Sequence, residues 1–282
     1  MRRFHRPARL ASAVAFAAAA LMLSPDFLRA ILVAPHAVFM EHRSRTGQVF
    51  LVNTGHEPEE VTIELKYGYP AADSAGTVFI RLIDQPDSTE PSAAGWIKAY
   101  PRRVVLGPGQ RQVVRLLATP PAGLPDGEYW SRIIATSRGS TVAVVGADSG
   151  VSAGLSLELR TIISLSYRKG LVHTGASVTD FRATRQGDSL VVWFGAERRG
   201  NAAFLGTLTY RLLDDAQHVR GEWETPVAVY HPLVRRYVFP LAGVPAGRYT
   251  VRMSLTTARS DLDRRHILPA DPVTRTVDLE GR

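Results

Sequence analysis

The stretch Leu155-Ser-Leu-Glu-Leu-Arg-Thr-Ile-Ile-Ser-Leu-Ser-Tyr167 alternates apolar and polar side chains, and Ile162 is the one even-numbered residue that is not polar. A period of two is typical of a half-buried β-strand, and this run is long for a single strand. Shorter runs of the same kind follow one another from residue 31 to the end, at 31–40, 48–52, 61–67, 104–106, 112–117, 129–136, 189–194, 205–212, 236–241, 249–256 and 273–279. Turn residues such as Gly107-Pro108-Gly109 separate them, which predicts an all-β chain made of β-sandwiches.

An internal repeat divides the chain in two. Leu124-Pro-Asp-Gly-Glu-Tyr129 recurs as Val244-Pro-Ala-Gly-Arg-Tyr249. A Gly-x-Tyr that opens a strand is typical of the tyrosine corner of an immunoglobulin-like sandwich. We therefore expect two tandem immunoglobulin-like domains, at residues 31–170 and 171–282, with residues 71–94 forming an insertion or hairpin loop in the first.

The N-terminus has the pattern of a secretory signal. Four arginines within the first nine residues precede an apolar, alanine-rich run from Leu10 to Leu23, which is shorter than a membrane span. Ser24-Pro25 ends that run, and Ala30 is a small residue suited to a cleavage site. Residues 1–30 are predicted to be a signal peptide, with an uncleaved membrane anchor as the alternative.

Composition excludes several kinds of function. The chain of 282 residues contains no cysteine, so it has no disulfide, thiolate metal site or cysteine nucleophile. Its net charge is +8, but the first thirty residues carry five arginines against one aspartate, which is half of that charge. The rest is too dispersed to predict a nucleic-acid-binding surface. The histidines are scattered and form no metal-binding motif.

Two short motifs imitate hydrolase signatures. Gly150-Val-Ser-Ala-Gly154 matches G-x-S-x-G, and Gly187-Asp-Ser-Leu190 matches the GDSL tetrad. The first motif needs a strand before it and a helix after it, whereas here a strand follows a glycine-rich loop. Both are interpreted as turns. The prediction is a protein that is not an enzyme, with no catalytic residue, metal or cofactor.

The first domain resembles a known family in five ordered segments. They are Ala37-Val-Phe39, Gln48-Val-Phe-Leu-Val-Asn53, Leu106-Gly-Pro-Gly109 with Gln112-Val-Val-Arg-Leu116, the Leu124-Pro125 corner, and Thr161-Ile-Ile-Ser-Leu-Ser-Tyr-Arg168. Together they are similar to the periplasmic pilus-assembly chaperones, the PapD-like family, over residues 31–168. The second domain resembles that family only as a predicted β-sandwich.

The resemblance implies a partner-binding strand. In that family the long last strand of the first domain completes an unfinished pilin subunit: backbone pairing gives affinity and alternate side chains set the register. Here the partner-binding residues would be Leu155, Leu157, Leu159 and Ile163. A free strand edge with an apolar face favours the same interpretation. The alternative is a central strand whose leucines lie in the domain's own core.

One family feature is missing. The family holds the partner's terminal carboxylate with an arginine and a lysine, and the matching positions here are His36 and Ser164. Neither provides the charge-assisted bond of those cations. Arg160 and Arg168 share the strand face of Ser164 by parity, so either is a candidate for a displaced anchor.

These features predict a periplasmic, chaperone-like protein that binds pilin-like or other exported subunits by strand donation. An outer-membrane usher would be a further partner, and neither nucleic acid nor a small-molecule cofactor is expected. The alternative is a structural or adhesive tandem-sandwich protein without a client.

Overall fold

The computed structural model describes residues 31–138, 142–145, 152–155 and 158–279. The predicted signal peptide, residues 1–30, lies outside these ranges. Within them the chain is all-β, and its only helical element is the short 3-10 turn η2 (Arg264–His266). No helix in the described part of the chain is long and apolar enough to cross a membrane.

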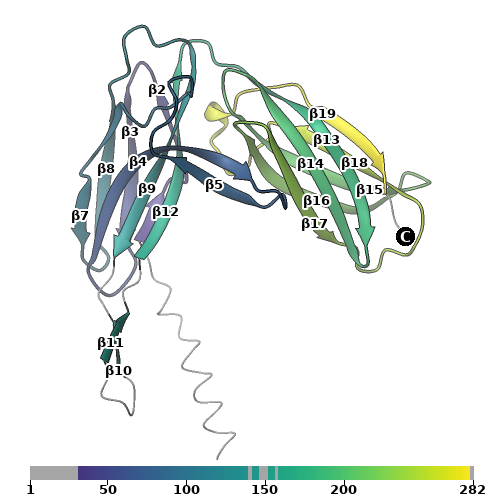
Figure 1. Ribbon diagram of the computed structural model, residues 1–282, viewed down its shortest axis with the longest axis horizontal. Helices are drawn as coiled ribbons and strands as arrows, with labels where there is room; N and C mark the ends of the chain where they lie inside the picture. Colours follow the sequence, from purple (N-terminus) through teal and green to yellow (C-terminus); the bar gives the residue numbers. More distant parts are fainter. Residues whose placement is uncertain (1–30, 139–141, 146–151, 156–157, 280–282) are drawn as a thin grey trace, which may run out of the picture.

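Two sheets pack face to face in the first domain, as Figure 1 shows. One has the order β1 (Ile31–Ala34), β3 (Thr46–Asn53), β8 (Arg111–Ala118) and β6 (Ile97–Tyr100). The other has the order β2 (Ala37–Glu41), β12 (Glu158–Lys169), β9 (Gly127–Arg138), β4 (Glu59–Ala72) and β5 (Val78–Ile83), with β7 (Arg103–Leu106) also paired to β4. Alternate apolar residues of both sheets, such as Leu51, Leu116 and Ile133, form one buried core.

The second domain is a further sandwich with its own core. One sheet has the order β13 (Thr174–Gln186), β14 (Ser189–Gly200) and β17 (Leu233–Pro240). The other has the order β16 (Val219–Val229), β15 (Phe204–Asp214), β18 (Tyr249–Thr256) and β19 (Val273–Asp278). Leu190, Phe194 and Leu212 lie fully inside this core. The two-sandwich prediction is confirmed, and the break between the two sets of sheets falls between Lys169 and Thr174.

The two tyrosines of the sequence repeat occupy equivalent corners. The Tyr129 hydroxyl donates to the backbone oxygen of Pro125 at 2.9 Å, and the Tyr249 hydroxyl donates to that of Pro245 at 3.1 Å. Each bond ties the start of a strand to the loop four residues before it, as expected of a tyrosine corner.

Removing either hydroxyl should weaken its domain modestly. We expect Tyr129→Phe and Tyr249→Phe each to lower the free energy of unfolding by about 0.5–1.5 kcal/mol, the net worth of one hydrogen bond. Urea titrations of both variants would measure this. Phenylalanine keeps the ring packing, so a loss well above this range in either variant would show that the hydroxyl does more than close a corner.

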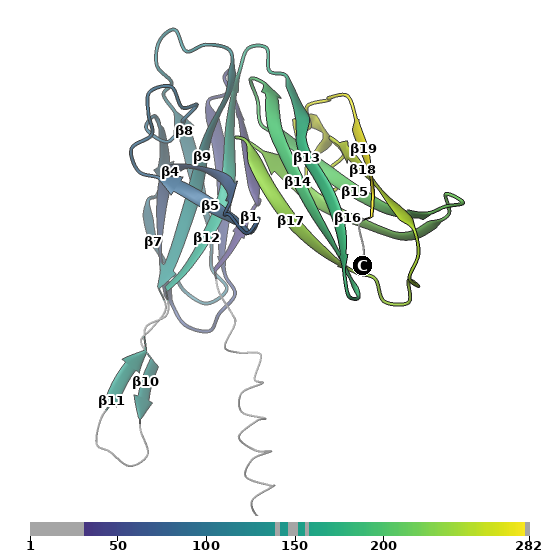
Figure 2. The same ribbon diagram turned by 45° about the vertical axis from the view of Figure 1, so that its right-hand side comes forward.

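One feature differs from the predicted strand pattern. Residues 155–167 do not form one strand, because Leu155 ends β11 (Ser152–Leu155), which forms a hairpin with β10 (Val142–Val145), and β12 begins at Glu158. In Figures 1 and 2 this hairpin projects from the end of the first domain that lies away from the domain junction. The expected hairpin after residue 71 is confirmed as the turn between β4 and β5.

The two domains meet over a buried polar contact. The Arg168 side chain at the end of β12 is only 5% exposed, and its Nε donates to Oε2 of Glu128 at 2.8 Å. The other Glu128 oxygen accepts from the indole N–H of Trp130 at 2.8 Å and from the backbone N–H of Ala203, in the second domain, at 3.3 Å. Arg168 also donates to the backbone oxygen of His266 at 2.8 Å. One ion pair thus links the first domain to two segments of the second.

An apolar cluster adjoins this ion pair. We call it the junction cluster: Tyr67, Tyr69 and Trp130 of the first domain with Ala203 and Tyr230 of the second. The Trp130 and Tyr230 rings meet edge to face with centroids 4.7 Å apart, a favourable aromatic geometry. Burial raises the pKa of the Tyr67 hydroxyl, which donates to Glu90 at 2.5 Å, and burial lowers the pKa of the neighbouring His231. Apolar packing and a buried ion pair therefore hold the same interface.

Candidate functional site: the open edge of strand β12

Strand β12 has a partner on both sides for only half its length. It pairs with β9 from Glu158 to Lys169, but with β2 only from Ser164 to Arg168. On the β2 side, residues 158–163 have no strand partner among the residues that the structure describes. We call this segment the open edge.

The chain before β2 explains why the edge stays open. Strand β1 pairs with β3 in the opposite sheet, and the chain reaches β12 only after Pro35. Proline has no N–H and cannot continue a hydrogen-bonded ladder, so it suits the point at which the chain changes sheets. Since β2 begins at Ala37, its pairing with β12 starts no earlier than Ser164.

Backbone groups of the open edge point outward in a regular pattern. The N–H of Ser164 donates to the His36 oxygen at 3.3 Å, which shows that its backbone groups face the β2 side. The register with β9 contains no bulge, so the same orientation recurs at every second residue. The N–H and C=O groups of Glu158, Arg160 and Ile162 therefore face the unpaired side and are oriented to receive an added strand.

Side chains at the open edge are partly apolar. Leu159 is 41% exposed and Ile162 is also exposed, and their odd and even positions place them on opposite faces of the strand. Glu158 accepts from Arg138 at 2.9 Å and from Arg160 at 2.8 Å, and these two bonds lower the pKa of its carboxyl group. The segment thus carries one exposed apolar side chain on each face, with charged residues at its end.

The predicted partner-binding residues are divided by the fold. Leu159 lies on the open edge. Ile163 is 4% exposed and packs in the core of the first domain, because strand parity places it on the same face as Leu165 and Tyr167, so it does not belong to the exposed part of the open edge. Leu155 belongs to β11 rather than to β12, and Leu157 lies outside the described residues.

The predicted anchor residues are also separated. Arg168 cannot serve as a displaced anchor, since Glu128 already neutralises it in the domain interface. His36 Nε2 lies 3.3 Å from Asp261 in the second domain. A hydrogen bond from Arg259 lowers the pKa of Asp261 to about 2. Ser164 is half-buried beside β2, and Arg160 is the exposed cation of the set, next to the open edge.

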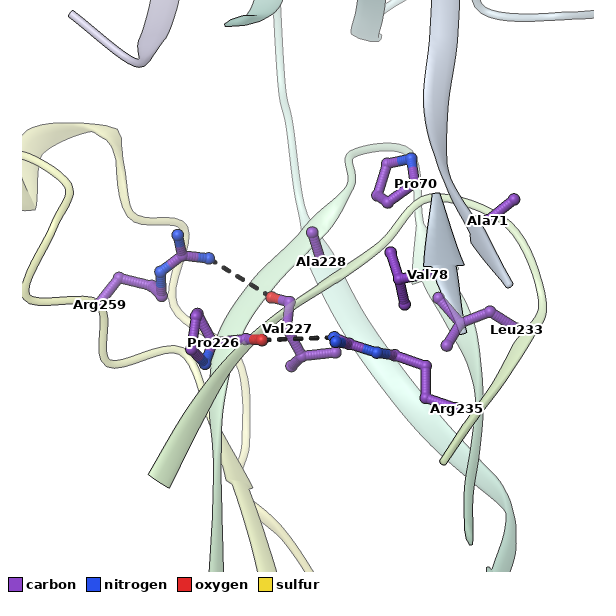
Figure 3. A pocket seen from close by; sticks show the side chains of 9 residues that line it. All are labelled: Pro70, Ala71, Val78, Pro226, Val227, Ala228, Leu233, Arg235 and Arg259. Carbon is purple, nitrogen blue, oxygen red and sulfur yellow. Dashed lines mark hydrogen bonds between the residues drawn. The ribbon is translucent and has the colours of Figure 1, made fainter. Parts of the chain in front are cut away.

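A cavity of about 180 Å³ lies between the domains, as Figure 3 shows. It is lined by Pro70, Ala71 and Val78 of the β4–β5 hairpin and by Pro226, Val227, Ala228, Leu233, Arg235 and Arg259 of the second domain. Arg235 and Arg259 make long bonds of 3.4 and 3.5 Å to the backbone oxygens of Pro226 and Val227 in β16, the outer strand of its sheet. Pro226 has no N–H to offer to an added strand, which protects that edge. The open edge of β12 has no such protection in the described structure.

No family model matches the sequence, and no curated protein does. Among solved structures, a chain of the complex between the chaperone CsuC and the tip subunit CsuE of Acinetobacter baumannii matches with a TM-score of 0.43 at 14% identity, over 90% of this chain and 99% of that chain. The class 5 fimbriae chaperone CfaA matches with 0.42 at 12% identity, over 88% and 98%. The E. coli chaperone DraB matches with 0.40 at 17% identity, over 79% and 89%.

The chain resembles the periplasmic pilus chaperones in fold. The solved structures named above are described as chaperones, alone or with a subunit. Gly187-Asp188 is the turn between β13 and β14, as interpreted from the sequence, whereas Gly150 and Val151 of the other motif lie outside the described residues. In the described residues no group of three His, Asp or Glu side chains is placed to hold a metal ion.

Sequence reasoning missed the buried polar interface. Glu128, Trp130 and Arg132 alternate along β9 on the face opposite to Tyr129 and Ile133, and all three are buried. A strand with large side chains on both faces is a strand covered on both sides. The sequence already contains these large side chains on both faces of the strand, and they would have indicated that the second domain packs on this face.

Proposed function

We propose that this protein is a periplasmic chaperone-like protein that binds an extended segment of a pilin-like subunit at the open edge of β12. The orientation of the backbone carries the proposal: three outward-facing N–H and C=O pairs, at Glu158, Arg160 and Ile162, are available to a third partner strand beside β9 and β2. An added strand would bond to these groups, and its alternate side chains would pack beside Leu159 and Ile162. The five segments that resemble the pilus-assembly chaperones support the same class of partner.

Arg160 is the residue that we propose for a carboxylate of the partner. It is exposed, and it shares its bond to Glu158 with Arg138, so one carboxylate faces two guanidinium groups. This leaves one positive charge in excess at the open edge. A carboxylate near the end of an added strand could accept a charge-assisted hydrogen bond from Arg160 and neutralise this excess charge. An outer-membrane usher is a further proposed partner.

Replacing Leu159 by glutamate should separate partner binding from folding. The side chain is partly exposed, so we expect the free energy of unfolding to change by no more than about 0.5 kcal/mol. Capture of a pilin-like subunit should be lost, because the apolar contact is replaced by a charge. The measurement is co-purification of a co-expressed pilin-like subunit from the same genome, with a melting curve of each variant.

Two further variants sharpen this test. Leu171→Glu, at a leucine that is 83% exposed in the segment between the domains, is the matched control and should retain capture. Ile162→Pro removes one N–H group from the open edge. The hydrogen bonds between β12 and β9 are unaffected, since the backbone groups of Ile162 face away from β9. This variant should also abolish capture of the subunit. A stable Leu159→Glu protein that still binds the subunit would contradict the proposal and favour a structural or adhesive role. A protein that unfolds would show that Leu159 belongs to the core.

A further inference from the structure

The six-stranded sheet of the first domain has a second free edge, formed by β5. This strand pairs with β4 and ends the strand order, so one side of it has no strand partner in the described chain. Val78, Phe79, Ile80 and Leu82 are all exposed, and Arg81 is the only charged residue of the strand. An apolar edge with a single charge and no proline is the kind of edge that pairs with another chain.

Backbone orientation determines which residues of β5 are free to pair. The carbonyl oxygen of Arg81 would lie 2.5 Å from a Cβ added to Gly68, so it points toward β4. Pro70 lies opposite Ile80 and has no N–H, which agrees with Ile80 not bonding to β4. By alternation, the N–H and C=O groups of Val78, Ile80 and Leu82 face outward.

We propose that two copies of this chain associate by antiparallel pairing of their β5 edges, with Ile80 of each copy opposite Ile80 of the other. The inference is independent of the open edge of β12. In this register Val78 lies opposite the second copy's Leu82, so each outward-facing residue bonds to an outward-facing residue. The side chains of these pairs are all apolar.

The other face of the paired strands favours the same register. Phe79 would lie opposite the second copy's Arg81, and Arg81 opposite the second copy's Phe79. The guanidinium of Arg81 already lies 5.9 Å from the centre of the Phe79 ring within one chain, which is within the range of a cation–π contact. Each arginine would therefore meet an aromatic ring and no like charge would face another.

Symmetry limits the assembly to two copies. Residue i of one strand meets residue j of the other and the reverse, so the contact is isologous and uses both β5 edges at once. The sheet of one copy, ending at β5, would continue into the sheet of the second. A second copy fits this strand better than an unrelated segment, because the strand's own sequence is complementary to itself in this register.

The absence of cysteine provides a direct test. Residues that exchange both hydrogen bonds in an antiparallel pair have Cα atoms about 5.5 Å apart, which suits a disulfide. Ile80→Cys should therefore form a disulfide-linked dimer rapidly under mild oxidation. Phe79→Cys, one residue out of register, and Val238→Cys, at an exposed apolar position in β17, should crosslink much more slowly.

Sedimentation equilibrium of the chain without any introduced cysteine gives the second measurement. We expect a monomer–dimer equilibrium that Ile80→Lys weakens by at least about tenfold, with an unchanged melting curve at protein concentrations at which the wild type is monomeric, because Ile80 is 38% exposed. Leu82→Lys is the second variant if Ile80→Lys does not fold. A wild-type chain that stays monomeric to millimolar concentration would overturn the proposal. So would a dimer that both lysine variants retain, or equal crosslinking of the three cysteine variants.

Discussion

Replacing Arg168 by methionine is expected to lower the free energy of unfolding by about 3–5 kcal/mol, because it leaves a buried carboxylate without its cation. The Glu128 side chain is fully buried, and Arg168 is its only charged hydrogen-bond donor among the described residues. Methionine fills much of the volume of the arginine stem, so the loss of charge dominates the change. Urea unfolding of the wild type and the variant, followed by circular dichroism, would measure the difference.

Two controls separate charge from packing. Arg182→Met removes one partner of an exposed ion pair with Asp180 and should change the stability by less than about 1 kcal/mol. The double variant Arg168→Met with Glu128→Leu replaces the whole pair by apolar groups and should recover much of the loss. A double variant as unstable as Arg168→Met alone would show that packing, and not the unpaired carboxylate, is responsible.

Local patterns in the sequence predicted most of the strands. Period-two alternation in segments such as 189–194 and 249–256 depends only on neighbouring residues, and these segments lie in β14 and β18. The corners at Tyr129 and Tyr249 are equally local, since each hydroxyl bonds to a loop four residues earlier. Fold class therefore followed from short-range information.

The open edge could not be predicted in the same way. Whether a residue of β12 has a neighbour depends on where a segment more than a hundred residues earlier changes sheets, at Pro35. Alternation alone gave Leu159 and Ile163 the same role, yet the core ends between them, with one exposed and the other buried. Strand parity shows on which face of the sheet a side chain lies, but it does not show at which residue that face stops being buried by the opposite sheet.

The ion pair between two residues that are distant in the sequence could not be predicted from the sequence either. Arg168 was considered as a free cation because its partner, Glu128, lies forty residues earlier in the chain and on another strand. Antiparallel pairing of β9 with β12 places Glu128 directly opposite Arg168, a register that the sequence does not specify without the hairpin between them. Buried charges are almost always paired, so the partner was to be expected although its identity was not.

Trp130 is the position at which a truncation should loosen the domain junction most. Its side chain is 1% exposed and touches both domains, through the ring of Tyr230 and the hydrogen bond to Glu128. We expect Trp130→Ala to lower the free energy of unfolding by about 3–5 kcal/mol, since a large cavity would form in the junction cluster. The variant also removes one of the donors that stabilise the Glu128 carboxylate, so its effect should not simply add to that of Arg168→Met.

The same substitution should change the relation between the domains before either domain unfolds. Small-angle scattering of Trp130→Ala under native conditions is expected to show a larger radius of gyration than the wild type, because the junction cluster loses its largest side chain while each sandwich keeps its own core. Trp130→Phe retains an aromatic ring against Tyr230 and should give a smaller loss of stability and little expansion. If Trp130→Ala unfolded without any expansion beforehand, the junction would be part of one cooperative unit with the first domain, and Trp130 would stabilise that domain rather than its contact with the second.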